Sequence, residues 1–271
     1  MMDANLLALL IINFAILAGI VLALWDISTR LRDASFIDAF WAFGMVLMAL
    51  ASWLHSGPAT PRGNILLALT AVWGIRLSLH LYTRWRAVGE DPRYKMIIGR
   101  AMEKKGWSWN KTALINVFAL QAPLLFITCL PAQIGIIASR DSTDLGALAF
   151  AGTAIAIIGI AFETIGDAQL KSFKADPANH GKVMDRGLWR YTRHPNYFGD
   201  FATWWGIWLV AADAGLGVAA ASIIGPLFLS FTLMKWSGGP LLERGMRKTR
   251  PGYADYIART SPFFPWPPKK G

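Results

Sequence analysis

The uncharged stretch at 5–25, NLLALLIINFAILAGIVLALW, decides the fold class of this chain. A helix needs about 20 mostly apolar residues to cross a bilayer, and this stretch is long enough. No Lys or Arg precedes it, and its apolar part is longer than the core of a cleavable signal peptide. We therefore expect it to stay in the mature chain as the first of several membrane-spanning helices.

Six more apolar runs follow, and the composition agrees with them. Hydrophobic residues make up 54% of the 271 residues and charged residues only 16%, whereas soluble domains carry about a quarter charged residues. A soluble nucleic-acid-binding protein is therefore excluded as the first interpretation. The sequence predicts an all-α, multi-pass integral membrane protein with one domain, 1–271, and seven transmembrane helices. The predicted spans are 5–25, 36–54, 64–83, 112–131, 144–166, 197–212 and 215–235.

The distribution of Lys and Arg predicts the orientation, because cytoplasmic loops carry an excess of basic residues. With the N-terminus outside, the inner connections hold 24 basic residues and the outer ones only Arg62 and Arg140. We therefore expect the N-terminus outside and the C-terminus in the cytoplasm. The net charge of +10 then reflects topology, and it also attracts anionic lipid headgroups. One cysteine and four histidines exclude a disulfide scaffold and a zinc ribbon, and no metal is expected.

Ionisable side chains inside the early spans gather near the inner face. Asp38 in the second span and His80 and Arg84, both within one turn of the inner end of the third span, lie at similar depth. Arg76, His80 and Arg84 also share one helix face. Such side chains cost several kcal/mol in a membrane unless they face a partner or a wet cavity, so each is a candidate site residue. The alternative is an ion pair of Asp38 with His80 or Arg84 that only locks two helices together.

The end of the fifth span carries Glu163, Asp167, Lys171 and Lys174 within one arc of the helix. The acids lie deeper than the lysines. This order suits a ligand with hydroxyl and amide groups at its inner end and phosphates at the mouth. The alternative interpretation is snorkelling lysines with ordinary pairs between adjacent turns.

The densest polar segment is 187–200, GLWRYTRHPNYFGD, directly before the sixth span. Pro195 suits the first turn of a helix, and Asn196 and Asp200 then share one face. Arg193 and His194 would stand at the helix entrance, where cations and free N–H groups favour an anion such as a pyrophosphate, unless they bind only lipid headgroups. The sequence has no G-x-G-x-x-G or G-x-x-x-x-G-K-[ST] motif, so any nucleotide would lie among helices.

These motifs together resemble the membrane steroid 5-alpha-reductase family, and most of all its uncharacterised bacterial branch. The likeness rests on Arg193-His194-Pro195-Asn196-Tyr197-Phe198-Gly199-Asp200, Glu163-x-x-x-Asp167, Glu90-Asp91-x-Arg93-Tyr94 and Pro251-x-Tyr253-x-x-Tyr256. It implies a seven-span enzyme of the bacterial inner membrane that holds NADPH in a cytoplasm-facing cavity. The expected reaction is reduction of a C=C bond conjugated to a carbonyl in a lipid-soluble substrate, steroid-like or another lipid. Neither nucleic acid nor an obligate protein partner is expected.

The resemblance also divides the chain into a substrate and catalytic part, 36–111, and a nucleotide-binding part, 144–260. The residues expected at the cofactor are Arg84, Arg93, Tyr94, Glu163, Asp167, Lys171, Lys174, Arg193, His194, Asn196, Tyr197, Asp200 and Tyr253.

The catalytic half departs from the family. Characterised steroid reductases hold the enone carbonyl with a Gln-Glu pair on the second span and a Tyr on the third. This chain offers Asp38 on the second span and His80 and Tyr82 on the third. We expect His80, oriented by Asp38, to polarise the carbonyl, with Tyr82 in reserve.

Two other classes remain as alternatives. Isoprenylcysteine and phospholipid methyltransferases, which bind S-adenosylmethionine, share an Arg-His-Pro-like segment and a Tyr-containing tail. Their usual pair of adjacent acids is replaced here by Glu243-Arg244, which favours the reductase. A transporter is the third class, but the charged residues gather at the inner face instead of near the midplane.

Overall fold

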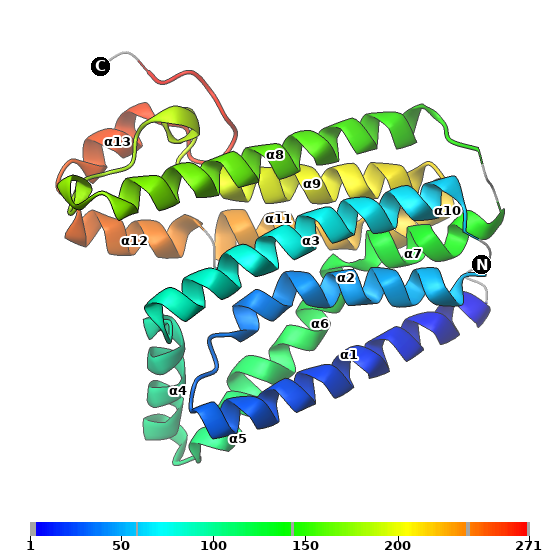
Figure 1. The fold of residues 1–271 in the computed structure, drawn as a ribbon, viewed down its shortest axis with the longest axis horizontal. Helices are drawn as coiled ribbons and strands as arrows, with labels where there is room; N and C mark the ends of the chain where they lie inside the picture. Colours follow the sequence, from blue (N-terminus) through cyan, green and yellow to red (C-terminus); the bar gives the residue numbers. More distant parts are fainter. Residues whose placement is uncertain (1–3, 58, 142–143, 237–238, 270–271) are drawn as a thin grey trace.

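A computed structural model describes residues 4–57, 59–141, 144–236 and 239–269. In this part of the chain all regular elements are helices, which confirms the all-α class (Figure 1). The long helices run back and forth along one common direction (Figure 1). The connection after Val88, the connection after Ala175 and the two C-terminal helices all lie at the same end of the bundle (Figure 1). The α-helices are α1 (Ala4–Leu31), α2 (Ile37–His55), α3 (Pro61–Val88), α4 (Pro92–Lys105), α5 (Trp109–Ala113), α6 (Ala119–Thr128), α7 (Leu130–Ala138), α8 (Ala147–Ala175), α9 (Pro195–Ala212), α10 (Leu216–Ser222), α11 (Ile224–Phe231), α12 (Gly239–Thr249) and α13 (Tyr253–Arg259).

Six helical segments among the described residues are long and apolar enough to cross a membrane, so the chain is a multi-pass membrane protein. They are Asn5–Leu31, Ile37–His55, Pro61–Val88, Trp109–Thr128, Ala147–Ala175 and Leu216–Trp236.

The predicted span 197–212 is not among these six. It forms α9, which has 18 residues and carries polar side chains such as Asn196 and Asp200. Helices α7, α8, α10 and α11 all pack against α9, and most of its residues are buried. A helix that neighbouring helices shield from lipid does not need an apolar surface, and this explains why α9 falls short in hydropathy.

Two apolar segments are broken. A π-helical turn, Leu114–Phe118, separates α5 from α6, and Cys129 separates α6 from α7. Pro131 stands in the first turn of α7, where its missing N–H costs nothing. The predicted span 112–131 is therefore a kinked rod that continues to Ala138. A second π-helical turn, Thr232–Trp236, ends the segment that begins with α10.

Close contact between α8 and α9 positions the polar residues of both helices. A Cβ atom added to Gly159 would lie 2.5 Å from the backbone nitrogen of Thr203, and one added to Gly199 would lie 2.5 Å from the backbone nitrogen of Glu163. Only glycine permits backbones to approach so closely. The contact brings Glu163 and Asp167 on α8 opposite Asn196 and Asp200 on α9.

Buried polar contacts fasten the bundle elsewhere. The Asn13 amide of α1 donates to Ser52 Oγ (2.8 Å) on α2 and to Gln133 Oε1 (3.0 Å) on α7. At the end of the bundle away from the C-terminal helices, Arg62 pairs with Asp213 at 2.9 Å. These contacts join helices from both halves of the chain into one unit.

Candidate functional site

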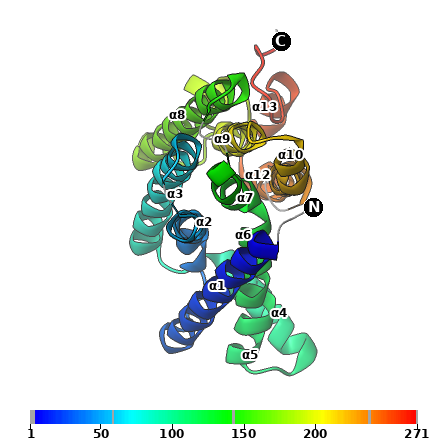
Figure 2. The same cartoon turned by 90° about the vertical axis from the view of Figure 1, so that its right-hand side faces the viewer.

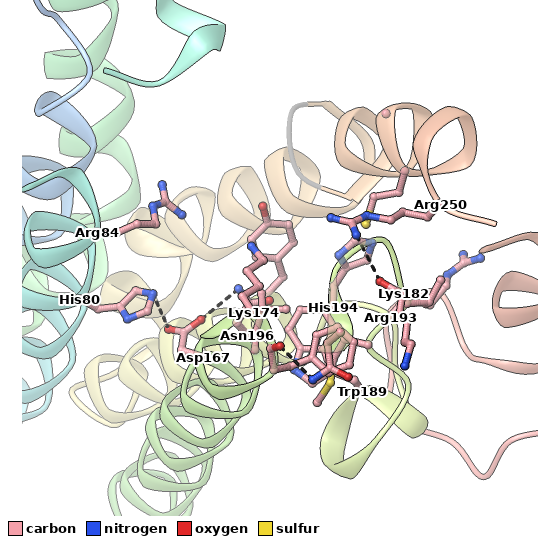
Figure 3. A pocket seen from close by; sticks show the side chains of 18 of the residues that line it. His80, Arg84, Asp167, Lys174, Lys182, Trp189, Arg193, His194, Asn196 and Arg250 are labelled. Carbon is pink, nitrogen blue, oxygen red and sulfur yellow. Dashed lines mark hydrogen bonds and ion pairs between the residues drawn. The ribbon is translucent and has the colours of Figure 1, made fainter. Parts of the chain in front are cut away.

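A cavity of about 900 Å³ opens at the end of the bundle that carries the C-terminal helices (Figure 3). Its walls come from α2, α3, α4, α8, α9, α12, α13 and the connection between α8 and α9. The lining therefore includes residues from both 36–111 and 144–260. A volume of this size is typical of sites for large organic ligands and cofactors.

Arginine 76 organises the deep end of the cavity. Its guanidinium pairs with Glu163 Oε1 at 2.5 Å and with Asp167 Oδ2 at 2.6 Å. Trp73 Nε1 donates to Glu163 Oε2 (3.0 Å), and Asn196 Nδ2 donates to Asp167 Oδ1 (3.2 Å). Helix α3 thus fixes the two acids of α8, whose remaining surface faces the cavity.

Three buried polar atoms of the lining lack a hydrogen-bond partner in the described part of the chain, and one of them, Arg193 Nε, forms an ion pair with Glu243. The other two are Asp200 Oδ1 and Tyr253 Oη, in residues that are 8% and 2% exposed. Buried polar atoms are nearly always satisfied, so each exception calls for an explanation. A ligand that donates to Asp200 and hydrogen-bonds Tyr253 would satisfy both atoms.

Histidine 80 lies at the cavity wall beside Asp167, with 3.9 Å between Nε2 and Oδ2 (Figure 3). Among the described residues Asp38 forms no ion pair or hydrogen bond with His80 or Arg84, so the structure shows neither the expected orientation of His80 by Asp38 nor the alternative ion pair. Asp38 instead accepts hydrogen bonds from Tyr94 Oη (2.5 Å) and from Arg93 (3.0 Å).

Helix α4 supplies these two partners of Asp38 because the chain reverses after α3. Gly89, with φ of 80°, makes the turn, a conformation that glycine adopts without strain. Burial, followed by the neighbouring Asp38 carboxylate, raises the pKa of Tyr94, so its hydroxyl stays protonated at a pH where a free tyrosine would lose its proton. Tyr94 supports the cavity wall from behind, while Asp38 itself lines the cavity.

The exposed part of the cavity lining, which we call its mouth, is predominantly basic, although Asp91 and Asp176 also line the cavity. Arg84 of α3, Lys174 of α8, Lys182 of the following loop and Arg250 after α12 all line it (Figure 3). Arg250 Nη1 donates to the Lys182 backbone oxygen at 3.5 Å. Neither Lys182 nor Arg250 is among the residues expected at the cofactor, because nothing in their spacing indicates that the loop and α12 meet.

A carboxylate fastens α12 over the cavity. Glu243 Oε1 lies 3.0 Å from His194 Nε2 and 3.1 Å from Arg193 Nε. Partial burial raises the pKa of Glu243, but the hydrogen bond with His194 and the charge of Arg193 outweigh it and hold the pKa below its usual value. Arg193 and His194 therefore anchor a wall of the cavity in addition to lining it.

Thirteen of the sixteen residues that the sequence analysis selected line this cavity. The three that do not are Tyr82, Tyr94 and Lys171. Tyr82 is 48% exposed and packs against Trp85, with ring centroids 5.9 Å apart. Lys171 is exposed. The residues of the set that line the cavity are Asp38, His80, Arg84, Arg93, Glu163, Asp167, Lys174, Arg193, His194, Asn196, Tyr197, Asp200 and Tyr253.

Comparison with known proteins places the chain in a family. The family described as "Protein of unknown function (DUF1295)" matches residues 24–260, a range that contains the whole cavity lining. An uncharacterised protein of Schizosaccharomyces pombe is 22% identical over 273 residues, which cover 89% of this chain and 75% of the yeast protein. No solved structure matches the chain. The chain therefore belongs to the DUF1295 family, which includes steroid 5-alpha-reductase-like proteins.

Proposed function

We propose that this chain is a membrane-embedded, NADPH-dependent reductase. Its reaction would be reduction of a C=C bond conjugated to a carbonyl in a lipid-soluble substrate. The observation that carries the proposal is the two-ended polarity of the cavity. Buried carboxylates and an amide line one end of the cavity, and four exposed or half-buried cations from separate elements line the other.

The residues present suit this cofactor. NADPH offers ribose hydroxyls and a carboxamide as donors, and its three phosphate groups are anionic. Glu163, Asp167 and the unpartnered Asp200 Oδ1 can accept from hydroxyl and amide groups. Arg84, Lys174, Lys182 and Arg250 can hold phosphate oxygens by charge-assisted hydrogen bonds. Asn196 and Tyr253 would complete the set.

The proposal includes an orientation. We infer that α9 also crosses the bilayer, as the sixth of seven spans in chain order, that the N-terminus lies outside, and that the cavity faces the cytoplasm. The distribution of 24 basic residues on one side against two on the other supports this. We further infer from the family resemblance that the membrane is the bacterial inner membrane.

Residues of α2 and α3 would carry the substrate half of the reaction. NADPH, when bound, would supply a hydride for the β carbon of the electron-poor C=C bond, and water would supply the proton that the resulting enolate takes up at its α carbon. His80 would donate a hydrogen bond to the substrate carbonyl, where negative charge develops, and such a donor supplies roughly 3 to 4 kcal/mol of barrier lowering. Trp41, Leu77 and Leu81 give this part of the lining an apolar surface, which suits a substrate that arrives from the bilayer.

A second candidate is a methyltransferase that uses S-adenosylmethionine. The three carboxylates opposed by the single Arg76 at the deep end favour it, because they would attract a sulfonium cation. The basic mouth argues against it, because S-adenosylmethionine carries no phosphate to pair with those cations. The reductase therefore accounts for both ends of the cavity, and the methyltransferase for one.

The test is turnover by the full chain reconstituted in nanodiscs. NADPH oxidation would be followed with a panel of lipid-soluble enones, for the wild type and for His80→Ala and His55→Ala. His55 is the matched control, because it lies at the end of α2 opposite Asp38 and does not line the cavity. We expect His80→Ala to lose 100-fold or more in kcat, as with removal of one donor to a developing charge, and His55→Ala to keep its activity. Equal activity of both variants would overturn the role of His80.

A further inference from the structure

A second polar surface lies outside the cavity, on α4, α5 and the connection between them. We call it the α4–α5 corner and define it by Lys95, Arg100, Lys104, Lys105, Trp107 and Lys111. None of these residues lines the cavity.

The position of the corner points to the membrane surface. Helix α4 runs across the direction of the long helices, at the end of the bundle where α3 ends (Figure 1). In the view along the bundle, α4 and α5 project beyond the helices around the cavity (Figure 2). If the long helices cross a bilayer, an element that projects sideways at their end lies over lipid and not over protein.

The charge of the corner is positive and largely uncompensated. Lys95 pairs with Glu90 at 3.2 Å. Arg100, Lys104, Lys105 and Lys111 are exposed, and the described part of the chain holds no carboxylate within ion-pair distance of them. Glu103 is the one acid between Pro92 and Lys111. Four exposed cations remain available to an anionic partner.

Apolar side chains stand among these cations. Met96 and Ile97 are 46% and 44% exposed, and at 100° per residue they project on the same side of α4 as Arg100 and Lys104. Tyr94 and Ile98 on the other side are buried. A helix that exposes apolar and basic side chains together is typical of the membrane interface, because water alone does not favour the exposed Met and Ile.

Trp107 likewise combines an apolar ring with basic neighbours. Lys105 Nζ lies 4.2 Å and Lys111 Nζ 4.7 Å from the centroid of the Trp107 ring. Tryptophan prefers the headgroup level of a bilayer, and the two ammonium groups at its ring would lie among headgroup phosphates. The ring also holds the two lysines near each other despite their mutual repulsion.

We propose that the α4–α5 corner binds the headgroups of anionic phospholipids and holds α4 in the plane of the membrane surface. Lipid headgroups and free inorganic phosphate would both bind these cations through phosphate oxygens. The exposed Met96 and Ile97 favour the lipid, because free phosphate would leave them in water. This proposal does not depend on the reductase function.

The test uses the full chain, purified in detergent and titrated with phosphatidylglycerol or phosphatidylcholine while native mass spectrometry counts bound lipids. The variant is Lys104→Gln/Lys105→Gln/Lys111→Gln. The matched control is Arg186→Gln/Lys235→Gln/Lys248→Gln, which removes three exposed charges outside the corner. Each cation near a headgroup contributes about a fivefold gain in affinity, so the corner variant should bind phosphatidylglycerol roughly 100-fold more weakly. The control should stay within a few fold of the wild type.

Three results would overturn the proposal. The first is equal binding of the two lipids by the wild type, and the second is equal loss of binding in both variants. The third is displacement of phosphatidylglycerol by millimolar inorganic phosphate but not by the same ionic strength of chloride, which would indicate a site for the free anion. If the corner variant does not fold, Lys104→Arg/Lys105→Arg/Lys111→Arg and a salt titration of the wild type replace it. The lipid preference should then survive the Arg changes and fall as salt rises.

Discussion

Arginine 76 should be the most sensitive single position of the cavity for stability. Its side chain is 19% exposed, and those of Glu163 and Asp167 are 4% and 8% exposed. Arg76→Gln would leave both carboxylates, with Asp200 nearby, without their cation. Removing one partner of a buried ion pair costs about 3 to 5 kcal/mol, because the remaining charge stays desolvated and unpaired. At about 2 °C per kcal/mol for a chain of this size, the apparent Tm should fall by roughly 6 to 10 °C.

The assay is thermal unfolding in one detergent at a fixed scan rate, with Arg86→Gln as the control. Arg86 belongs to the same helix and is exposed, so its replacement should change the apparent Tm by a degree or so. The double variant Arg76→Gln/Glu163→Gln removes one of the unpaired charges and should recover part of the loss. The reasoning is refuted if Arg76→Gln unfolds at the same temperature as Arg86→Gln, or if the double variant is less stable than the sum of its single changes.

Three further predictions follow from other contacts. Gly159→Ala places a Cβ 2.5 Å from the Thr203 nitrogen and should destabilise the chain by about 1 to 3 kcal/mol, whereas Gly19→Ala, with nothing within 4 Å, should cost nothing in thermal unfolding. Asn13→Leu removes both hydrogen bonds that join α1 to α2 and α7 and should cost about 0.6 to 1.7 kcal/mol; an unchanged Tm would contradict the role of this contact. The Glu243 pKa is lowered in the folded chain, so its contribution to stability is present above the ordinary pKa and is lost as the pH falls through the folded-state value. The Tm difference between wild type and Glu243→Gln should therefore be largest near neutral pH and shrink in acid, and a constant difference would refute the assignment.

Helical periodicity predicted most of the cavity. Glu163 and Asp167 are one turn apart, as are Asn196 and Asp200, so the sequence placed each pair on one face. That the two faces meet depends on Gly159 and Gly199, where the backbones of α8 and α9 touch. The sequence analysis did not use Gly159 and Gly199, although these two glycines are the feature of the sequence that indicates close packing of α8 on α9.

Contacts between distant segments were harder to predict. The partners of Asp38 come from α4, which returns to α2 only because the chain reverses at Gly89. Lys182 reaches the mouth on a loop without regular spacing, and Arg250 reaches it from the end of α12. Arg76 was recognised as buried, but its partners lie on another helix. Hydropathy alone does not identify α9 as a span, because the neighbouring helices cover most of its surface and its side chains are more polar than those of a lipid-facing helix.

Ligand discrimination by the purified full chain tests the central claim most directly. Thermal shift would be measured with NADPH, NADH and S-adenosylmethionine for the wild type, Asp200→Asn and Lys182→Gln/Arg250→Gln. At 100 times Kd a ligand stabilises by about 2.7 kcal/mol. The account predicts a clear shift with NADPH that the paired basic change at the mouth weakens, a smaller shift with NADH, and none with S-adenosylmethionine. A shift with S-adenosylmethionine alone, unaffected by loss of Lys182 and Arg250, would contradict it.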